Sequence, residues 1–327
     1  MHSTRLGPAG GGTRMNVYDT PQDGLADAMR LSRAMTAKFA VAGVDFGGGK
    51  AVLAVRELPR GYERRDLLLR YGDTVASLRG GFVTAPDMNT TESDMDVVAE
   101  RAEGFVFCRS PEHGGSGSSA PATALGVFHG IRATVQRALD RDVEGLTVLV
   151  QGAGRVGGAL VELLAGAGAR VLVSDLDEDR AQGVAANAHA SVVPADRALD
   201  SECDVYAPCA VGGVLNEQTI ARLRCRVVAG AANNQLASPA DAQRLAARGI
   251  LYAPDFVINA GGVFHGIGKE LLGWDDERLG RELESIGDTL REVFDRAERD
   301  GTSTEAAAQR LADERLSTPT QPRALAR

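Results

Sequence analysis

The sequence predicts an α/β protein of two domains, the second of which holds a doubly wound parallel sheet. In the second half of the chain, short apolar runs alternate with helical segments, as in right-handed βαβ units. A Gly/Ser-rich stretch over 110–119 separates this half from a first α/β segment and is typical of a hinge. We therefore expect a first domain over 1–115, a second domain over 116–302, and C-terminal helices that pack back on the first domain, the last of them over about 303–327.

The first domain is predicted to alternate helices and strands around a glycine turn. Apolar spacing predicts a helix from Leu25 to about Lys38, with Asp23 as its N-cap. Buried strands are expected over 39–46 and 51–55, on either side of Gly47-Gly48-Gly49-Lys50. Further along we expect a helix over 66–78, an extended segment over 81–84, and a helix over 92–103 capped by Thr90 or Thr91.

The second domain is predicted to begin with a helix over about 123–139. Strands are then expected over 146–150, 170–174, 204–206, 226–229 and 250–252, with helices from Asp177 and over 215–223. Leu279, Leu283, Ile286, Leu290 and Val293 form one apolar stripe on a long helix. A shorter helix over 304–316 follows, and the tail over 317–327 is expected to fray.

Charge and composition exclude several classes of protein. The net charge of −8 and the lack of a long basic run argue against a nucleic-acid partner. No stretch is apolar enough to span a membrane or to form a signal-peptide core, so we expect a cytoplasmic protein with no membrane partner. The spacing of the cysteines and histidines fits no metal site. Cys108, Cys203, Cys209 and Cys225 are therefore expected to be buried free thiols.

A glycine motif after the predicted strand 146–150 indicates a dinucleotide site. Gly152-Ala153-Gly154-Arg155-Val156-Gly157 fits G-x-G-x-x-G and opens an apolar helix, and Asp175 ends the next strand 18 residues later. The glycines allow a tight turn and a close approach of the backbone to a pyrophosphate, which the helix N-terminus also favours. Asp175 can accept hydrogen bonds from both adenosine ribose hydroxyls and would repel a 2′-phosphate. The predicted cofactor is therefore NAD rather than NADP.

Two lysines and an aspartate are candidates for proton transfer in the first domain. Lys50 follows three glycines between two apolar segments, and Lys38 lies where a helix meets the first of them. Asp87 lies in a loop after a strand. If the lysines shared one cleft, burial and mutual repulsion would lower a lysine pKa toward a useful range, and the glycines would let substrate approach the backbone. Residue chemistry alone leaves open whether the three form a site or are solvated surface charges.

Several separated motifs resemble the Glu/Leu/Phe/Val amino acid dehydrogenases, over almost the whole chain. They are Met35-Thr36-Ala37-Lys38, Gly47-Gly48-Gly49-Lys50, Thr84-Ala85-Pro86-Asp87, Ala231-Ala232-Asn233-Asn234-Gln235 and the run from Tyr252 to Gly262. Within the family, the stretches over 114–119 and 271–274 are most similar to phenylalanine dehydrogenases. The resemblance implies reversible, NAD-dependent oxidative deamination of an L-amino acid to its 2-oxo acid and ammonium.

The resemblance also implies roles for individual residues. Lys38 would bind the substrate carboxylate, Lys50 would act as general acid and base, and Asp87 would exchange protons with the amine. Asn233 would touch both the substrate and the nicotinamide ribose. The other implied cofactor contacts are Thr123 and Asn259 at the nicotinamide amide, Arg14 at the cofactor side of the cleft, and Cys209, Ala210 and Ala231 lining the site. Without the resemblance, Asn233 and Asn259 would be interpreted as loop caps, and no cationic partner near Cys209 in sequence marks it as a nucleophile.

Three positions bear on substrate size. Gly10 and Gly266, the latter three residues after Val263, stand where larger residues are usual in leucine-type members, which predicts an enlarged pocket. Ala85 points the other way, because phenylalanine-type enzymes often have glycine there. We therefore expect phenylalanine-like or other bulky hydrophobic substrates, with a leucine or valine dehydrogenase as the alternative.

The start of the chain suggests a second hypothesis. Met1 lies close to the Gly7-Pro8-Ala9 motif, whereas members resembling this chain have a helix and a strand before it. An edge strand missing from the first domain could disturb the homo-oligomer that the resemblance implies. The alternative function is therefore a truncated, weakly active NAD-binding protein with a regulatory or assembly role.

Overall fold

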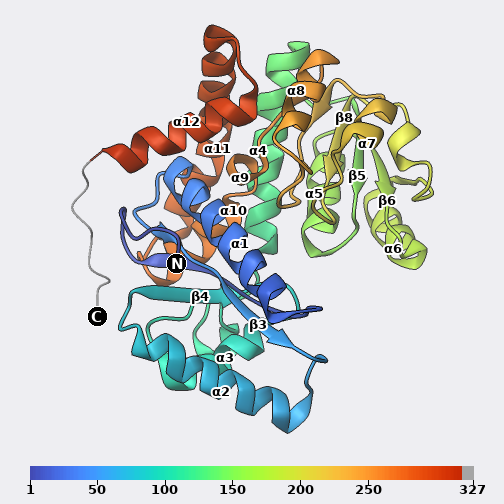
Figure 1. The fold of residues 1–327 in the computed structure, drawn as a ribbon. Coiled ribbons are helices and arrows are strands. Elements are labelled where there is room, and N and C mark those ends of the chain that lie inside the picture. The colour runs from blue at the N-terminus through green and yellow to red at the C-terminus, as the bar shows by residue number, and fades with distance from the viewer. Residues whose placement is uncertain (319–327) are drawn as a thin grey trace. The chain divides into compact units, whose positions relative to one another are not determined.

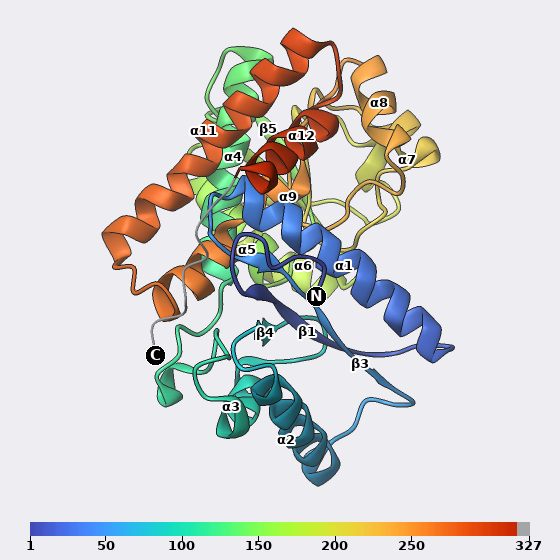
Figure 2. The same ribbon diagram turned by 60° about the vertical axis from the view of Figure 1, so that its left-hand side comes forward.

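The computed structural model describes residues 1–318 and divides the chain into two compact units. The first unit contains Met1–Ser119, Val263–Leu279 and the chain from Ala312, and the second contains Ala120–Gly262 and Gly280–Leu311. Each unit has its own parallel sheet with helices packed on it (Figures 1 and 2). The predicted α/β class with a doubly wound second sheet is confirmed.

The boundaries of the units differ from the predicted ones at three places. Residues 116–119 and 263–279 belong to the first unit, and residues 303–311 belong to the second. Segment 263–279 joins the first unit because it packs there: Gly266 lies against Phe107 and Cys108, and a Glu270 oxygen accepts a hydrogen bond from the Cys108 amide at 2.7 Å. Of the predicted C-terminal tail, residues 319–327 lie outside the described residues.

The first unit has four parallel strands, with β1 between β4 on one side and β2 and β3 on the other. Its strands are β1 (Ala9–Val17), β2 (Gly47–Gly48), β3 (Ala51–Val55) and β4 (Phe82–Pro86). Its helices are α1 (Pro21–Val41), α2 (Gly61–Ser77), α3 (Glu92–Ala102), the short η1 (Pro111–His113) and the π-helical turn η3 (Phe264–Gly268).

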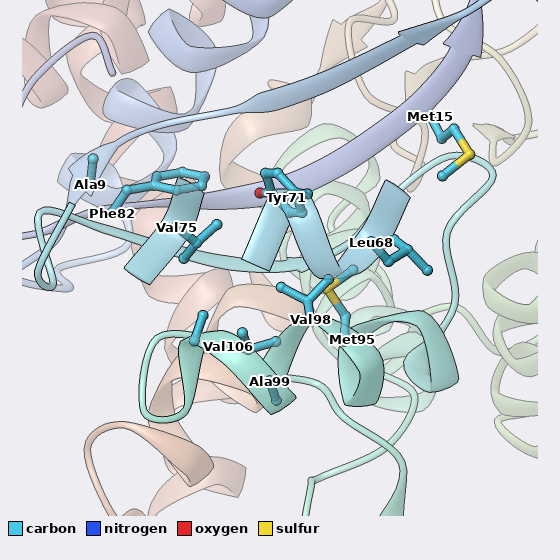
Figure 3. Packing of buried hydrophobic residues seen from close by; sticks show 11 residues of the cluster. Ala9, Met15, Leu68, Tyr71, Val75, Phe82, Met95, Val98, Ala99 and Val106 are labelled. Atoms are coloured by element: carbon cyan, nitrogen blue, oxygen red, sulfur yellow. The ribbon is translucent and has the colours of Figure 1, made fainter. Parts of the chain in front are cut away.

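Helices cover both faces of this sheet. Helices α2 and α3 lie on one face, where Met15 and Phe82 of the sheet pack with Leu68, Val75 and other apolar side chains in the core shown in Figure 3. Helix α1 lies on the other face (Figure 1). It approaches so closely that a Cβ on Gly48 would lie 2.1 Å from the Thr36 hydroxyl oxygen. Glycine at position 48 therefore allows α1 to pack directly on the backbone of β2.

The second unit is built on six parallel strands in the order β10-β9-β8-β5-β6-β7, the arrangement typical of dinucleotide-binding sheets. Its strands are β5 (Thr147–Gln151), β6 (Arg170–Ser174), β7 (Ser191–Val192), β8 (Val205–Pro208), β9 (Val227–Val228) and β10 (Leu251–Tyr252). Its helices are α4 (Ala120–Leu139), α5 (Arg155–Gly166), α6 (Glu178–Ala188), η2 (Ala198–Asp200), α7 (Glu217–Arg222), α8 (Ala240–Ala247) and α9 (Asp255–Ile258). Three further helices, α10 (Gly261–Val263), α11 (Asp276–Asp300) and α12 (Thr304–Ser317), each have residues in both units.

The sequence predictions fail mainly around β1 and α1. The expected strand over 39–46 is wrong, because Phe39–Val41 end α1 and a turn follows. A helix end buried on all sides has the same continuous apolar run as a buried strand. Helix α1 begins at Pro21 rather than Leu25, because Thr20 and Asp23 form a capping box and Asp23 is its third residue rather than its N-cap. The sequence predicts no strand at β1, because three of its nine residues are glycines and glycine is depleted in strands.

Other elements match closely. Thr91 caps α3, Asp177 caps α6, and β3 and β6 have the predicted bounds. The four cysteines are free, as predicted, but only Cys108 is buried, and the other three are half-buried. In the part of the chain that the structure describes, no helix is both long and apolar enough to cross a bilayer, and no cluster of His, Cys, Asp and Glu side chains could hold a metal ion.

Two helical glycines predict opposite effects on stability. Alanine is favoured over glycine inside a helix by about 1 kcal/mol. At Gly183 in α6 a Cβ would meet no atom within 4 Å, so Gly183→Ala should raise the free energy of unfolding by that amount. At Gly72 in α2 a Cβ would lie 2.7 Å from the Val98 carbonyl oxygen of α3, so Gly72→Ala should lower it by about 1–3 kcal/mol. Urea unfolding of both variants tests this, and stabilisation by Gly72→Ala would contradict the observed packing of α2 on α3.

Candidate active site

Two of the three proton-transfer candidates, Lys50 and Asp87, lie together on the face of the sheet that carries α1. Side chains alternate between the two faces along β1, and the Thr13 hydroxyl bonds the Tyr71 hydroxyl of α2 on the opposite face, at 2.6 Å. Gly12 and Arg14 therefore face α1. A Cβ on Gly12 would lie 2.9 Å from Cβ of Asp87, so glycine at this position lets the Asp87 loop close over the strand.

Asp87 is shared between two cations. Its Oδ1 lies 2.9 Å from the Lys50 ammonium nitrogen, and its Oδ2 accepts a hydrogen bond from Nε of Arg14 at 2.9 Å. The side chains of Lys50 and Asp87 are 7% and 20% exposed. This geometry agrees with the prediction that Lys50 and Asp87 belong to one site. It disagrees with the alternative that the two are solvated surface charges.

Burial and charge shift both groups. Burial lowers the pKa of Lys50 below its usual value, although the Asp87 carboxylate opposes that shift. Burial acts to raise the pKa of Asp87, but the charges and hydrogen bonds of Lys50 and Arg14 outweigh it and bring that pKa to about 2. Asp87 is therefore an anion throughout the neutral range, and Lys50 is the group whose protonation can change.

The loop that carries Asp87 is fixed to β1. The Thr90 hydroxyl donates to the Thr13 carbonyl at 2.7 Å and accepts from the Asp87 amide at 2.9 Å. The Asn89 amide group donates to the Met15 carbonyl at 3.0 Å, and Asn89 has a φ of 59°, a left-handed conformation that asparagine tolerates. The Asp87 carboxylate is thus held by backbone contacts as well as by its two cations.

The glycines before Lys50 serve packing rather than substrate approach. A Cβ on Gly47 would lie 2.0 Å from the Ser3 carbonyl oxygen, and one on Gly49 would lie 2.6 Å from the Phe82 ring. With Gly48 against Thr36, the protein itself occupies all three positions, which corrects the expectation that substrate lies there. Lys38 is buried in the last turn of α1, two residues beyond Thr36.

Arg14 lies with the proton-transfer residues and has a second partner that the sequence analysis missed. Its Nη1 donates to Oδ2 of Asp27 at 2.9 Å, and Asp27 also accepts from the Tyr18 hydroxyl at 2.7 Å. Asp27 is in the second turn of α1, and no motif links it to Arg14 in the sequence. Its pairing with Arg30, three residues later on the same helix, is the usual pattern of a solvated helix face, so the sequence carries no signal for this contact.

The glycine turn of the second unit has the crowding that a pyrophosphate loop requires. Gly152 has a φ of 110°, and a Cβ there would lie 2.9 Å from the Ala210 amide nitrogen. A Cβ on Gly157 would lie 1.8 Å from the Gly152 carbonyl oxygen, so helix α5 packs directly on the turn. Gly154 is the N-cap of α5, and a Cβ there would meet nothing within 4 Å. The open side of the turn lies at a helix N-terminus, where a phosphate binds well.

Asp175 follows β6 and is tied to the glycine turn. Its Oδ2 accepts a hydrogen bond from the Ala153 amide at 2.7 Å, and its Oδ1 accepts from the Asp177 amide at 2.9 Å. Burial acts to raise the pKa of Asp175, but these amides and Arg180 lower it overall. Arg180 lies 3.6 Å from Asp175 and also pairs with Asp177 at 2.9 Å. An anionic carboxylate at this position suits a free ribose and disfavours a 2′-phosphate.

Asn259 provides an independent indication of a ligand in this unit. Its amide nitrogen donates to the Ala231 carbonyl at 3.0 Å and to Oδ1 of Asn233 at 2.9 Å. Its own Oδ1 is buried and lacks a hydrogen-bond partner. A buried acceptor without a donor costs free energy, so a ligand donor such as a carboxamide NH₂ fits this position. The residues present therefore fit NAD at both of its ends.

The remaining predicted cofactor contacts are distributed over the same unit. Thr123 is in the first turn of α4, and Arg155 and Val156 open α5. Cys209 and Ala210 follow β8, where Ala210 crowds Gly152. Burial raises the pKa of the Cys209 thiol to about 12, which agrees with the prediction that it is no nucleophile.

The two glycines expected to enlarge the substrate pocket do not leave empty space. A Cβ on Gly10 would lie 2.9 Å from the Phe39 ring and 3.3 Å from Ile267. A Cβ on Gly266 would lie 2.6 Å from both the Phe107 ring and the Cys108 sulfur. Side chains of the first unit fill these positions, so the volume argument for a bulky substrate is wrong. Ala85 is buried in β4, and Val263 is half-buried.

The dinucleotide-binding sheet of the second unit and the buried Lys50–Asp87 pair of the first unit are the features of a dinucleotide-dependent dehydrogenase. The chain belongs to the Glu/Leu/Phe/Val dehydrogenase family, because the profile of its dimerisation domain matches residues 1–103 and the Glutamate/Leucine/Phenylalanine/Valine dehydrogenase profile matches residues 114–178 and 173–323. It is therefore an amino acid dehydrogenase, an oxidoreductase, and its cofactor is NAD.

Curated relatives and a solved structure agree with this family. The chain is 42% identical to leucine dehydrogenase of Thermoactinomyces intermedius over 97% of its own length and 86% of that protein. It is 46% identical to valine dehydrogenase of Streptomyces coelicolor over 97% and 87% of the two chains. The crystal structure of L-tryptophan dehydrogenase from Nostoc punctiforme superposes with a TM-score of 0.82 at 39% identity, covering 97% and 90% of the two chains.

We predict that the Asp175 carboxylate makes the enzyme prefer NAD over NADP. Asp175→Ser removes the charge that repels a 2′-phosphate and leaves Arg180 without that partner. The ratio of kcat/KM for NAD to that for NADP should then fall at least tenfold, mainly through a higher KM for NAD. Asp179→Asn in α6 removes the same charge from a neighbouring position and should leave the ratio unchanged. An unchanged ratio in Asp175→Ser would show that this carboxylate does not select the cofactor.

Proposed function

We propose that the protein catalyses the reversible, NAD-dependent oxidative deamination of an aliphatic L-amino acid, such as leucine or valine, to its 2-oxo acid and ammonium. The similarity to leucine and valine dehydrogenases over 97% of the chain supports this substrate class. The observation that carries the choice over phenylalanine is the filling of Gly10 by Phe39 and of Gly266 by Phe107. The interpretation as a leucine or valine dehydrogenase thus replaces the phenylalanine-like one.

Lys38, Lys50 and Asp87 supply the binding and proton transfers of this reaction. Lys38 binds the substrate carboxylate as a buried cation. Asp87, an anion at neutral pH, accepts a hydrogen bond from the substrate ammonium and relays one of its protons to solvent, so that the amine is neutral when its Cα loses a hydride. Neutral Lys50 then takes a proton from the water that attacks the iminium carbon and passes it to the amino group, and it takes the remaining hydroxyl proton as the C–N bond breaks and ammonia leaves. The carbon is oxidised, and water supplies the oxygen of the 2-oxo acid.

NAD, when bound, accepts the hydride from the substrate Cα. The backbone of Gly152–Gly157 holds the pyrophosphate, and Asp175 holds the adenosine ribose. Asn259 and Thr123 orient the nicotinamide amide, and Asn233 contacts the nicotinamide ribose and the substrate. The other proposed cofactor contacts are made mainly by backbone atoms. They come from Arg155, Val156, Cys209, Ala210 and Ala231.

We also propose that the protein assembles as a homo-oligomer through its first unit. The family profile that matches residues 1–103 is that of a dimerisation domain, which supports this assembly. The proposed partners are otherwise small molecules, namely the amino acid, the 2-oxo acid and ammonium.

A panel of L-amino acids tests the substrate class. With NAD in excess at alkaline pH, kcat/KM for leucine or valine should exceed that for phenylalanine at least tenfold, because a ring needs space that Phe39 and Phe107 occupy. NADH formation at 340 nm provides the measurement. Equal or higher kcat/KM for phenylalanine would contradict the aliphatic class, and NAD binding without turnover of any amino acid would favour the regulatory or assembly role.

Gly10→Ala serves as the matched control for this panel. Its methyl group would press on the Phe39 ring, so we expect a lower melting temperature with an unchanged leucine-to-phenylalanine ratio. A selective loss of activity toward the larger substrate would show instead that position 10 borders the substrate.

The pH dependence of activity tests Lys50. Only neutral Lys50 can act as the base, so kcat/KM for oxidative deamination should rise with pH to a plateau. Its midpoint should lie below the usual pKa of lysine because burial lowers the pKa of Lys50. Asp87, with a pKa of about 2, remains ionised and adds no inflection in this range.

Lys50→Arg keeps the positive charge opposite Asp87 but cannot lose its proton. Its kcat should fall by about 10²–10⁴-fold, the range of a lost general base. Lys269→Arg makes the same exchange at an exposed lysine paired with Asp276 and should retain full activity. More than a tenth of wild-type kcat in Lys50→Arg would exclude Lys50 as the base.

A further inference from the structure

A continuous chain of charges extends from Lys50 to helix α1. Beyond the Lys50–Asp87 and Asp87–Arg14 contacts, Nη1 of Arg14 bonds Oδ2 of Asp27 at 2.9 Å. Oδ2 of Asp27 also accepts from the Tyr18 hydroxyl at 2.7 Å, and its Oδ1 accepts from Arg30 at 2.6 Å. Cations and anions therefore alternate from the catalytic lysine to a helix residue with no direct contact to it.

The burial of Asp27 is not explained by the packing of α1. Its side chain is 13% exposed, whereas Leu25 and Met29 on the same helix are 61% and 64% exposed. The helix thus buries a carboxylate while two large apolar side chains face solvent. Burying a charge costs free energy that even a good partner only roughly offsets, so a buried ion pair is weak evidence for a purely stabilising role.

We propose that Asp27 is a positioning residue for proton transfer, which acts by fixing the Arg14 guanidinium so that Arg14 in turn holds Asp87 against Lys50. This inference rests on the proposed function above and assigns Arg14 to the proton-transfer residues rather than to the cofactor. The guanidinium is planar, and Nε and Nη1 are each engaged by a different carboxylate. Two contacts at different nitrogens fix both the position and the plane of the group.

Asp27 also balances the charge around Lys50. The charged groups of the cluster are Arg14 from β1, Asp27 and Arg30 from α1, Asp87 from the loop after β4, and Lys50 before β3, with the Tyr18 phenol beside Asp27. The Arg14 charge lowers the pKa of Lys50, and the Asp27 charge raises it. Removing the Asp27 charge should therefore lower the pKa of Lys50 further.

The test compares Asp27→Asn with wild type across a pH series, using the best substrate of the panel. We expect kcat to fall about tenfold, and the midpoint of the kcat/KM profile to move down by about half a pH unit. The dissociation constant for NAD, measured by quenching of the fluorescence of Trp274, the single tryptophan, or by calorimetry, should not change. Asp27→Glu, which keeps the charge, should restore the midpoint.

Asp94→Asn is the matched control. Asp94 is a buried carboxylate of the same unit that pairs with Arg64 at 2.6 Å and has no contact with the Lys50 cluster among the described residues. Its loss should lower the melting temperature without moving the pH midpoint. Tyr18→Phe removes one donor to Asp27 without changing any charge, and should lower kcat a few-fold with an unmoved midpoint and unchanged NAD affinity. Tyr18→Phe therefore tests the positioning role of Asp27 if Asp27→Asn does not fold.

Three results would overturn the inference. The first is an unchanged kcat in Asp27→Asn, or an unchanged kcat in Tyr18→Phe if Asp27→Asn does not fold. The second is a shift in the midpoint of the kcat/KM pH profile of Asp94→Asn as large as the shift in Asp27→Asn. The third is a loss confined to NAD affinity, which would make Arg14 a cofactor residue. Each of these results leaves the proposed function intact if wild type oxidises an amino acid. If wild type oxidises none while binding NAD, the proposed function fails and the positioning role fails with it.

Discussion

The arrangement of the first unit depends on one interaction: the Asp87 carboxylate pairs with two cations, Lys50 and Arg14. Asp87 gives one oxygen to Lys50 and the other to Arg14, and it offsets the cost of burying the Lys50 ammonium and, together with Asp27, that of the Arg14 guanidinium. Burial is what makes Lys50 useful, because an exposed lysine holds its proton too firmly to act as a base near neutrality. Asp87 thus has two opposing effects: it stabilises the buried ammonium and so limits how far the pKa of Lys50 falls.

That cluster exists because several glycines let backbone approach backbone. A Cβ on Gly11 would lie 1.9 Å from the Gly49 carbonyl oxygen, and Gly12 and Gly48 make similarly close contacts with the Asp87 loop and with α1. Each missing side chain lets two segments of the first unit pack closely, and at Gly12 the neighbouring segment is the loop that carries Asp87. The glycine turn of the second unit follows the same logic, since Gly157 packs α5 on the turn while Gly154 leaves an open side for a phosphate.

The sequence allowed the second unit to be predicted better than the first. Local signals define its strands, its caps such as Asp177, and the spacing from Gly157 to Asp175, and the structure agrees with these. The first unit depends on contacts between distant residues. No local rule links Arg14 to Asp27, and the run from Phe39 to Phe46 has strand-like composition, although Phe39 ends a helix and packs on Gly10. The hydrophobic periodicity of a sequence indicates which face of a helix or strand is buried, but it does not indicate which other segment packs against that face.

The same distinction explains why substrate size was misjudged from the sequence. A glycine in place of a larger residue shows only that a side chain is absent, and the vacated volume goes to whichever neighbour can reach it. At Gly10 the neighbour is Phe39, and at Gly266 it is Phe107 with Cys108, so two aromatic side chains of the protein occupy the positions that an aromatic substrate was expected to use. Close packing makes this the normal outcome, because interiors leave few voids larger than a water molecule. Substrate size in this family is therefore better inferred from the residues facing a glycine than from the glycine itself.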